Sequence, residues 1–367
     1  MNLYTHVGGW SMHQSATIKD VALKAGCGVA TVSRVLNNTG SASPEMRSRV
    51  AAAVKELDFQ FSEVGRSLQS STTRTIGFVV PSIANPVYAD ALQGAQEVLT
   101  SSGYQMLLIC TNYSPESELS AIRTLISKQV AGIVLTVSDA ERSEGLSIIR
   151  NRSLPYCLLY NNAPVSHESW SVDDEAAAAR VAQAFSENLH NQTGFLALNF
   201  NKSDRARQRY EGYCVGCKAR GMKKPQLLEI SEDFEDLTMK LKLFLRENPS
   251  ITGIFASNDF LALAIVRSAR KLALNVPRDL SIIGFDGIDV GLMVEPTLAT
   301  IVTEPKMLGA GAGRTVLSFI NKTEFPKPPS ADQTFNFRAG GSLAYLGAES
   351  SDDGKITPFP SSFDPTN

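Results

Sequence analysis

The sequence lacks any long hydrophobic segment. No run of about 18 apolar residues occurs in the 367-residue chain, so no transmembrane helix is predicted. Residues 1–16 also lack the basic patch followed by an apolar core that marks a secretory signal. We therefore expect a cytoplasmic protein that does not associate with membranes. The 43% hydrophobic and 20% charged residues are typical of a globular chain long enough for more than one domain.

Cysteine and histidine are both scarce. The five cysteines are an odd number spread over a long chain, which favours reduced thiols over a disulfide framework. Cys214 and Cys217 have a metal- or redox-type spacing, but no second pair and no histidine cluster accompanies them. We interpret both as part of an amphipathic helix and predict no metal ion.

Motifs typical of cofactor-binding enzymes are missing as well. Residues 309–314 read GAGAGR, which fails the GxGxxG dinucleotide-binding spacing because Arg314 takes the last position. Small residues in a helix that packs closely on its neighbour explain this segment better. The sequence contains no phosphate-binding loop and no nucleophile elbow. We therefore expect neither a cofactor nor enzymatic activity.

The net charge of −2 gives little indication of a partner, but its distribution is uneven. Residues 12–70 carry seven basic and five acidic side chains, a balance of +2, which leaves −4 for the rest of the chain. A basic end on an acidic body weakly favours an N-terminal region that contacts phosphates.

Three short helices are predicted within the first sixty residues. Residues 17–25 and 29–37 have apolar side chains at helical spacing, with Thr17 as a suitable N-cap, and residues 26–28 (Gly-Cys-Gly) separate them. A third helix is predicted from Ser43-Pro44 to about Leu57. This arrangement is typical of a helix-turn-helix unit, whose second helix enters the DNA major groove. Spacing alone leaves open a plain helical hairpin inside a larger domain.

From residue 75 onward, short apolar runs alternate with amphipathic stretches. Such runs suit buried parallel strands, and the stretches between them suit helices. The runs form two successive series: 76–80, 104–109, 131–135 and 156–160, then 194–198, 226–230, 253–256 and 281–285. We infer two doubly wound α/β lobes with parallel sheets. A ligand site is expected where the carboxyl ends of the strands face the cleft between the lobes.

The segment TIKDVA, followed by AG and ATVSRVLN, resembles the DNA-binding head of the LacI/GalR family almost residue for residue. The motifs IGFVVPSIANPVY, GIFASND and IIGFDGID extend this resemblance to about Ser342. The resemblance implies an all-α three-helix helix-turn-helix head on a two-lobed body like that of periplasmic binding proteins. It also implies a homodimer on a pseudo-palindromic operator of double-stranded DNA, and a small effector, such as a sugar or sugar derivative, between the lobes.

The resemblance further implies a set of DNA contacts. The residues concerned are Thr17, Val29, Ala30, Thr31, Ser33, Arg34, Asn37 and Leu68. Val29, Ala30 and Arg34 would read bases, and Arg34 can make a bidentate contact to guanine. The threonines, Ser33 and Asn37 would hold phosphates. The family commonly has Val-Ser where this chain has residues 27–28 (Cys-Gly). The second helix therefore lacks a serine N-cap, which costs only a few tenths of a kcal/mol, so we expect it to form.

A hinge that folds into a helix on DNA is implied for residues 61–74. Leu68 matches the leucine that enters the minor groove, where an apolar wedge can kink DNA. Residues 61–62 (Phe-Ser) stand where Pro-Asn is typical, and Gly65 replaces an alanine, which costs about 1 kcal/mol in a helix. We therefore expect a weak hinge helix whose ordering depends on the operator. Packing of Leu68 between two heads is the alternative.

The implied effector contacts come from both lobes. They are Asn85, Pro86, Tyr88 and Asn112 from the first lobe, and Asp173 or Asp174, Arg209, Phe234, Asn258 and Asp286 from the second. Asn and Asp suit vicinal hydroxyls, Arg anchors an oxygen or an anion, and an aromatic ring covers an apolar sugar face. Simpler roles stay open, because Asp286 and Asn258 could cap helices and Phe234 could belong to the core. Arg209 could form a surface ion pair.

The predicted organisation has five segments. They are a disordered extension (1–15), the head (16–60), the hinge (61–74), the body (75–345) and a disordered tail (346–367). Within the body, the first lobe takes about 75–172 and 305–322, and the second takes 173–304 and 323–345. Met12 is the expected native start. The tail has no leucine heptads, so we expect a dimer rather than a tetramer built by the tail.

The sequence therefore predicts a sequence-specific DNA-binding transcription regulator of the repressor type. It would control a sugar or small-metabolite utilisation operon, with operator affinity set by an effector bound between two lobes. The alternative is a solute-binding protein without a role on DNA, which shares the body but leaves residues 17–68 unexplained.

Overall fold

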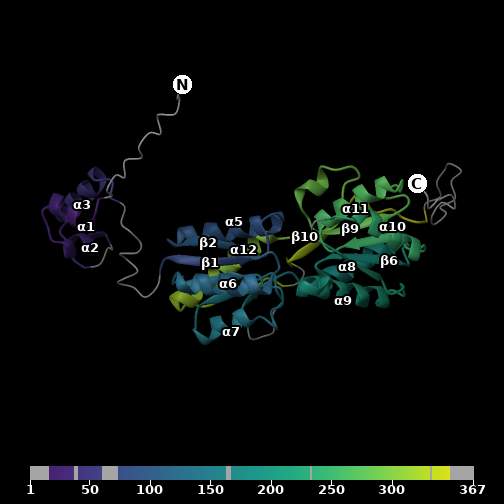
Figure 1. The fold of residues 1–367 in the computed structure, drawn as a ribbon, viewed down its shortest axis with the longest axis horizontal. Helices are drawn as coiled ribbons and strands as arrows, with labels where there is room; N and C mark the ends of the chain where they lie inside the picture. Colours follow the sequence, from purple (N-terminus) through teal and green to yellow (C-terminus); the bar gives the residue numbers. More distant parts are fainter. Residues whose placement is uncertain are drawn as a thin grey trace, which may run out of the picture. The chain divides into compact units, whose positions relative to one another are not determined.

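The structure is a computed structural model that describes residues 16–36, 40–59, 73–162, 167–231, 234–330 and 333–347 (Figure 1). The chain divides into two compact units, of which the first ends at Thr73 and the second begins at Arg74. The predicted extension, hinge and disordered tail, and the DNA contacts Asn37 and Leu68, lie wholly or almost wholly outside the described residues.

The first unit is a three-helix head with its own core. Its helices are α1 (Ile18–Ala25), α2 (Val29–Leu36) and α3 (Pro44–Glu56). Gly26 ends α1 with a positive φ of 62°, a backbone conformation that favours glycine. Ser43 caps α3 by accepting from the amide of Met46 at 3.2 Å, as predicted from the Ser-Pro pair. The fully or nearly fully buried core residues are Val21, Ala22, Ala25, Val32, Val50 and Ala53.

The first lobe of the body contains a parallel five-stranded sheet of order β2-β1-β3-β4-β5. Its strands are β1 (Thr75–Val80), β2 (Gln105–Cys110), β3 (Gly132–Leu135), β4 (Tyr156–Leu159) and β5 (Ser169–Trp170). Helices α5 (Pro86–Ser101) and α12 (Pro305–Asn321) cover one face of the sheet, and α6 (Pro115–Ser127) and α7 (Glu144–Asn151) cover the other (Figure 1).

The second lobe contains a six-stranded sheet of order β11-β10-β9-β8-β6-β7, in which only β11 is antiparallel. Its strands are β6 (Thr193–Leu198), β7 (Gln226–Ile230), β8 (Gly253–Ala256), β9 (Ser281–Asp286), β10 (Ala299–Thr303) and β11 (Phe335–Arg338). Its helices are α8 (Asp174–Glu187), α9 (Asp204–Ala219), α10 (Leu237–Glu247) and α11 (Asp259–Lys271), with short 3-10 turns η1 (Phe200–Lys202) and η2 (Asp289–Leu292). Because α12 packs on the first lobe, the chain passes between the lobes at the ends of both β10 and α12.

Glycines allow α12 to approach its neighbours closely. A Cβ atom on Gly309 would lie 1.8 Å from the carbonyl oxygen of Ala91 in α5. One on Gly311 would lie 2.2 Å from the ring of Trp170, whose Nε1 donates to the Thr315 hydroxyl at 2.9 Å. The GAGAGR segment is therefore a small-residue helix surface, as the sequence predicts.

Candidate functional site

The first candidate site is the outer face of α2 in the head. Val29, Ala30 and Arg34 are all exposed there, while Val32 on the opposite face is completely buried. Thr31 and Ser33 are half-buried. The side chains predicted to read bases therefore lie on the solvent side of a helix that the head core holds in place.

The first two helices both begin without a serine cap. The carbonyl of Gly28 accepts from the amides of Thr31 at 2.9 Å and Val32 at 3.1 Å, so α2 begins at Val29 as expected. At the start of α1, the Asp20 carboxylate accepts from both the backbone amide and the hydroxyl of Thr17, each at 2.7 Å. Thr17 thus lies at the helix end that the family resemblance assigns to a phosphate.

The second candidate site is a cavity of about 380 Å³ between the two lobes of the body. It lies at the carboxyl ends of strands, where residues that close β9 and β10 or directly follow β4, β6 and β8 form part of its wall. Its aromatic lining comes from Tyr88, Tyr113, Tyr160, Phe234, Phe260 and Phe285. Its amide and charged lining comes from Asn85, Asn199, Arg205, Arg209, Asn258 and Asp286.

Six of the residues predicted as effector contacts line this cavity: Asn85, Tyr88, Arg209, Phe234, Asn258 and Asp286. Pro86 does not, because it forms the first turn of α5 behind its N-cap Asn85. Asn112 is exposed, and its neighbour Tyr113 lines the cavity instead. Asp173 caps α8 by accepting from the Ala176 amide at 2.9 Å and is also absent from the wall.

Asp286 connects the two lobes across the cavity. It ends β9 with a φ of 115°, which is unusual for a side chain with a Cβ atom, and it is buried. The amide Nδ2 of Asn85, from the first lobe, donates to its carboxylate at 2.9 Å. Burial raises the pKa of Asp286 to about 6, although Arg209 and the Asn85 hydrogen bond act in the opposite direction. Its carboxylate therefore faces Asn85 and does not cap η2.

Arg209 is fixed on three sides. Its Nε donates to buried Asp174 at 2.7 Å, and its Nη1 donates to the carbonyl of Ser257 at 2.6 Å. The guanidinium stacks 3.5 Å above the Phe285 ring. Its ion-pair partner is thus a buried carboxylate in α8 rather than a surface residue, and burial raises the pKa of that Asp174 carboxyl.

Asn258 has the helix-capping role that the sequence left open, and it is also part of the cavity wall. Its Oδ1 caps α11 by accepting from the Leu261 amide at 2.8 Å. The next residue, Asp259, is completely buried and accepts from the amides of Gly287 and Ile288 at 2.8 and 2.9 Å. Asp259 therefore holds the loop that follows Asp286, a supporting role that the sequence analysis did not predict.

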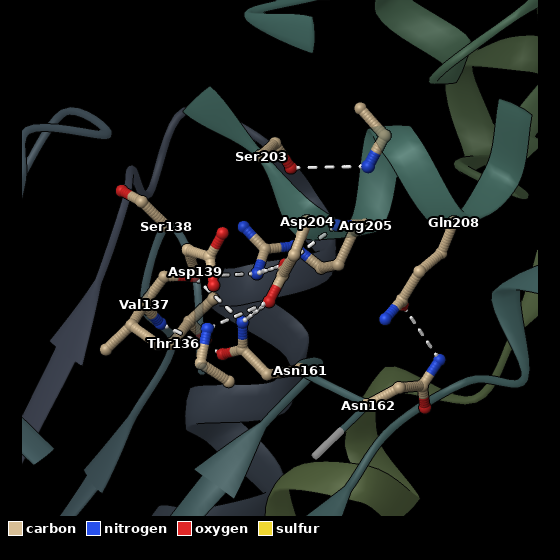
Figure 2. A network of polar contacts seen from close by, with 12 residues as sticks. Thr136, Val137, Ser138, Asp139, Asn161, Asn162, Ser203, Asp204, Arg205 and Gln208 are labelled. Atoms are coloured by element: carbon tan, nitrogen blue, oxygen red, sulfur yellow. Dashed lines mark hydrogen bonds and ion pairs between the residues drawn. The ribbon is translucent and has the colours of Figure 1, made fainter. Parts of the chain in front are cut away.

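A buried polar network joins the start of α9 to the first lobe beside the cavity (Figure 2). The Asp204 carboxylate accepts from the Ala140 amide at 3.2 Å and from Asn161 Nδ2 at 2.8 Å, both in the first lobe. Arg205 donates from Nη1 to the Val137 carbonyl at 2.9 Å. Neither residue was predicted, because the sequence does not show that the start of α9 meets the ends of β3 and β4.

Two further properties follow from the described residues. None of the helices among them is long and apolar enough to cross a membrane. The same ranges contain no group of His, Cys, Asp and Glu side chains arranged to hold a metal ion.

Both units match known protein families. Residues 17–62 match the bacterial regulatory proteins of the LacI family. Residues 73–333, more than half of the chain, match the periplasmic binding proteins and sugar-binding domains of the LacI family. The chain belongs to the LacI family. It is therefore a DNA-binding transcriptional regulator whose body is a sugar- or metabolite-binding domain, as the sequence analysis predicts.

Relatives of this LacI-family regulator match along most of its length. The HTH-type transcriptional regulator GntR of Escherichia coli K12 is 29% identical over 328 residues, which cover 89% of this chain and 98% of that protein. The ribose operon repressor of Halalkalibacterium halodurans is 33% identical over 314 residues, which cover 83% and 91%. Both relatives are regulators of transcription by name.

Solved structures share the fold of this LacI-family chain. The Lac repressor dimer bound to operator and the anti-inducer ONPF has a TM-score of 0.77 at 20% identity, covering 90% of this chain and all of that one. The complex of the transcriptional regulator CelR with cellobiose has a TM-score of 0.65 at 22% identity, covering 89% and 99%. At these identities the likeness supports the fold, namely a helical head with a two-lobed α/β body.

Proposed function

We propose that this regulator is a repressor that binds a pseudo-palindromic operator as a homodimer and that an effector in the interlobe cavity controls its operator affinity. The hydrogen bond between Asn85 and Asp286 is the observation that carries the proposal, because it spans the two lobes inside the cavity. A ligand that bonds either side chain changes the contact between the lobes. The names of relatives support repression of a metabolic operon, since two of them are ribose operon repressors.

The proposed DNA interface is the exposed face of α2 with its flanking residues. Arg34 would make the bidentate contact to guanine, while Val29 and Ala30 would pack against base edges such as a thymine methyl. Thr17, Thr31, Ser33 and Asn37 would hold phosphates, and Leu68 would enter the minor groove. We propose that this function involves no catalytic step and that the protein acts in the cytoplasm, where bacterial DNA lies.

The proposed effector contacts are the predicted residues that line the cavity. Asp286, Asn85 and Asn258 would bond vicinal hydroxyls, Arg209 would anchor an oxygen, and Tyr88 and Phe234 would cover apolar ring faces. Effector binding changes the angle between the lobes and thereby the separation of the two heads. By thermodynamic linkage, operator and effector must change each other's affinity by the same factor.

Selection of genomic DNA fragments by the full chain at two salt concentrations tests the operator function. We expect a palindromic site whose affinity falls steeply with salt. Arg34→Ala should weaken binding to this site by about 1–3 kcal/mol, because one base-specific bidentate contact is lost. Asp286→Ala is the matched variant in the body: it should keep operator affinity and lose the effector response. A chain that selects no site but still binds a sugar would favour the solute-binding alternative.

A further inference from the structure

The N-terminus of α9 borders the effector cavity. Ser203, Arg205 and Ala206, which belong to its cap and first turn, all contribute to the cavity wall. The dipole of this 16-residue helix gives its N-terminus a partial positive charge that favours anions, although its first amides already donate to Ser138, Asp204 and Ser203. This property alone does not identify a ligand, because many helices begin at clefts.

Arg205 provides an independent observation at the same place. The residue is only 5% exposed, and both of its guanidinium hydrogen bonds leave from Nη1, to Val137 and to Asp204 (Figure 2). Its Nη2 is buried and has no acceptor among the described residues. Burial opposes the charge, yet Tyr88 and Asp204 raise the pKa of Arg205 above its ordinary value, so the guanidinium stays protonated. A buried cationic donor without an acceptor is costly, so the site lacks one partner.

The neighbouring carboxylate cannot provide that partner. Asp204 already accepts four hydrogen bonds: from the Arg205 amide at 2.7 Å, from its Nη1 at 3.1 Å, and from the first-lobe groups Ala140 N and Asn161 Nδ2. These bonds use both carboxylate oxygens and tie Asp204 to the first lobe. The missing acceptor must therefore come from outside this network.

The charges of the cavity wall also favour an anion near α9. Arg205 and Arg209 are four residues apart and so lie on the same side of α9, one turn from each other. Both line the cavity, whereas Asp286 is the one carboxylate among the described lining residues. Asp286 comes from β9 and is already bonded to Asn85. The α9 side of the wall is thus basic, and the acidic side chain lies on another element.

We propose that the effector carries an anionic oxygen group, a carboxylate or a phosphate, that accepts from Arg205 Nη2 at the N-terminus of α9. This inference rests on the proposed effector function of the cavity and specifies its ligand class. The hydroxyl-bearing remainder of the ligand lies toward Asn85 and Asp286. Because Arg205 also bonds the Val137 carbonyl, the same side chain links the bound anion to the contact between the lobes.

Isothermal titration and thermal shift of the full chain test the ligand class with matched probes. The probes are glucose, gluconate and glucose 6-phosphate, with the corresponding neutral, carboxylate and phosphate forms of galactose and ribose. We expect one anionic probe to bind at least about tenfold tighter than its neutral counterpart, as a charge-assisted hydrogen bond implies. Comparison of the carboxylate probes with the phosphate probes then shows which of the two anionic groups the site prefers.

Substitutions at Arg205 identify the residue responsible. Arg205→Met should reduce affinity for the anionic probe to that of the neutral one, and Arg205→Lys should recover part of it. Arg207→Met is the matched control, since Arg207 lies on the same helix, pairs with Asp139 at 2.7 Å and does not line the cavity. Circular dichroism melting establishes that each variant is folded. If Arg205→Met does not fold, the comparison of the wild type with Arg205→Lys decides.

A neutral sugar that binds as tightly as its acid and phosphate would overturn the inference while leaving the proposed effector function intact. Equal affinity of the wild type and both Arg205 variants for an anion would also overturn it. A panel in which no anion binds, in a chain that still selects an operator, contradicts the anionic ligand class but not the DNA-binding function. If the wild-type chain selects no operator from genomic DNA, the proposed function itself is contradicted.

Discussion

Replacement of Asp204 by alanine should destabilise the body more than any other single change at the interlobe contact. Asp204 is 8% exposed, and its two oxygens accept from two backbone amides, from Asn161 Nδ2 and from Arg205 Nη1 (Figure 2). Alanine removes both oxygens at once. The four donors then lose this acceptor in a site that water reaches poorly. Arg205 Nη1 keeps the Val137 carbonyl, but the buried guanidinium loses its counter-charge.

The expected loss in the free energy of unfolding depends on the buried guanidinium of Arg205, which remains charged when Asp204 is removed. Breaking a buried ion pair by removing one partner typically costs about 3–5 kcal/mol, because the other charge remains uncompensated. Arg207→Met removes another ion pair on the same helix, with Asp139 in the first lobe, but those side chains are 31% and 24% exposed. A solvent-accessible pair of this kind contributes about 0–1 kcal/mol. The two variants therefore differ mainly in burial.

Urea denaturation followed by tryptophan fluorescence measures the difference, since buried Trp170 in the first lobe reports on the body. With a urea m-value of about 3 kcal/mol/M, Asp204→Ala should lower the midpoint by about 1–2 M. Arg207→Met should lower it by less than about 0.3 M on the same scale. Equal shifts for the two variants would refute the argument that burial makes the Asp204 network the stronger contact.

Three further predictions concern local features of the two units. Gly28→Ser should increase the free energy of unfolding of the head by a few tenths of a kcal/mol, because a Cβ there meets nothing within 4 Å and serine can cap α2. Its thermal midpoint should therefore rise slightly, and a lower midpoint would contradict this. The raised pKa of Asp286, about 6, means that the folded state binds a proton between about pH 4 and 6, so stability falls as pH rises through this range. Urea titrations at several pH values should show a shallower fall for Asp286→Asn, and an unchanged slope would argue against the raised pKa. Gly311→Ala should destabilise the body by about 1–3 kcal/mol in thermal melts, because its Cβ would meet the Trp170 ring at 2.2 Å. Gly313→Ala, with no contact closer than 3.6 Å, should instead stabilise α12, and the same sign for both would contradict the packing argument.

The elements that depend on local spacing could be predicted from the order of residues alone. The head is the clearest case, because Gly26, the Ser43 cap and the periodic apolar residues act within a few residues of each other. The apolar strands of both lobes were predicted for the same reason. By contrast, β5, β10 and β11 were not, since β5 has two residues and the other two mix polar with apolar side chains.

Which side chains meet could not be predicted in this way, because it depends on how distant segments fold together. Asn85 and Asp286 are 201 positions apart, and no local pattern indicates that they bond. The adjacent residues Asp173 and Asp174 have different roles. At the start of α8, Asp174 points inward and accepts from Arg209, whereas Asp173 is the N-cap of the helix. Arg205 gave no sequence signal, since its burial depends on first-lobe strands about 70 positions earlier in the chain. Hydrogen bonding and burial at the cavity are properties of segments brought together by folding, whereas helix and strand periodicity is a property of neighbours along the chain.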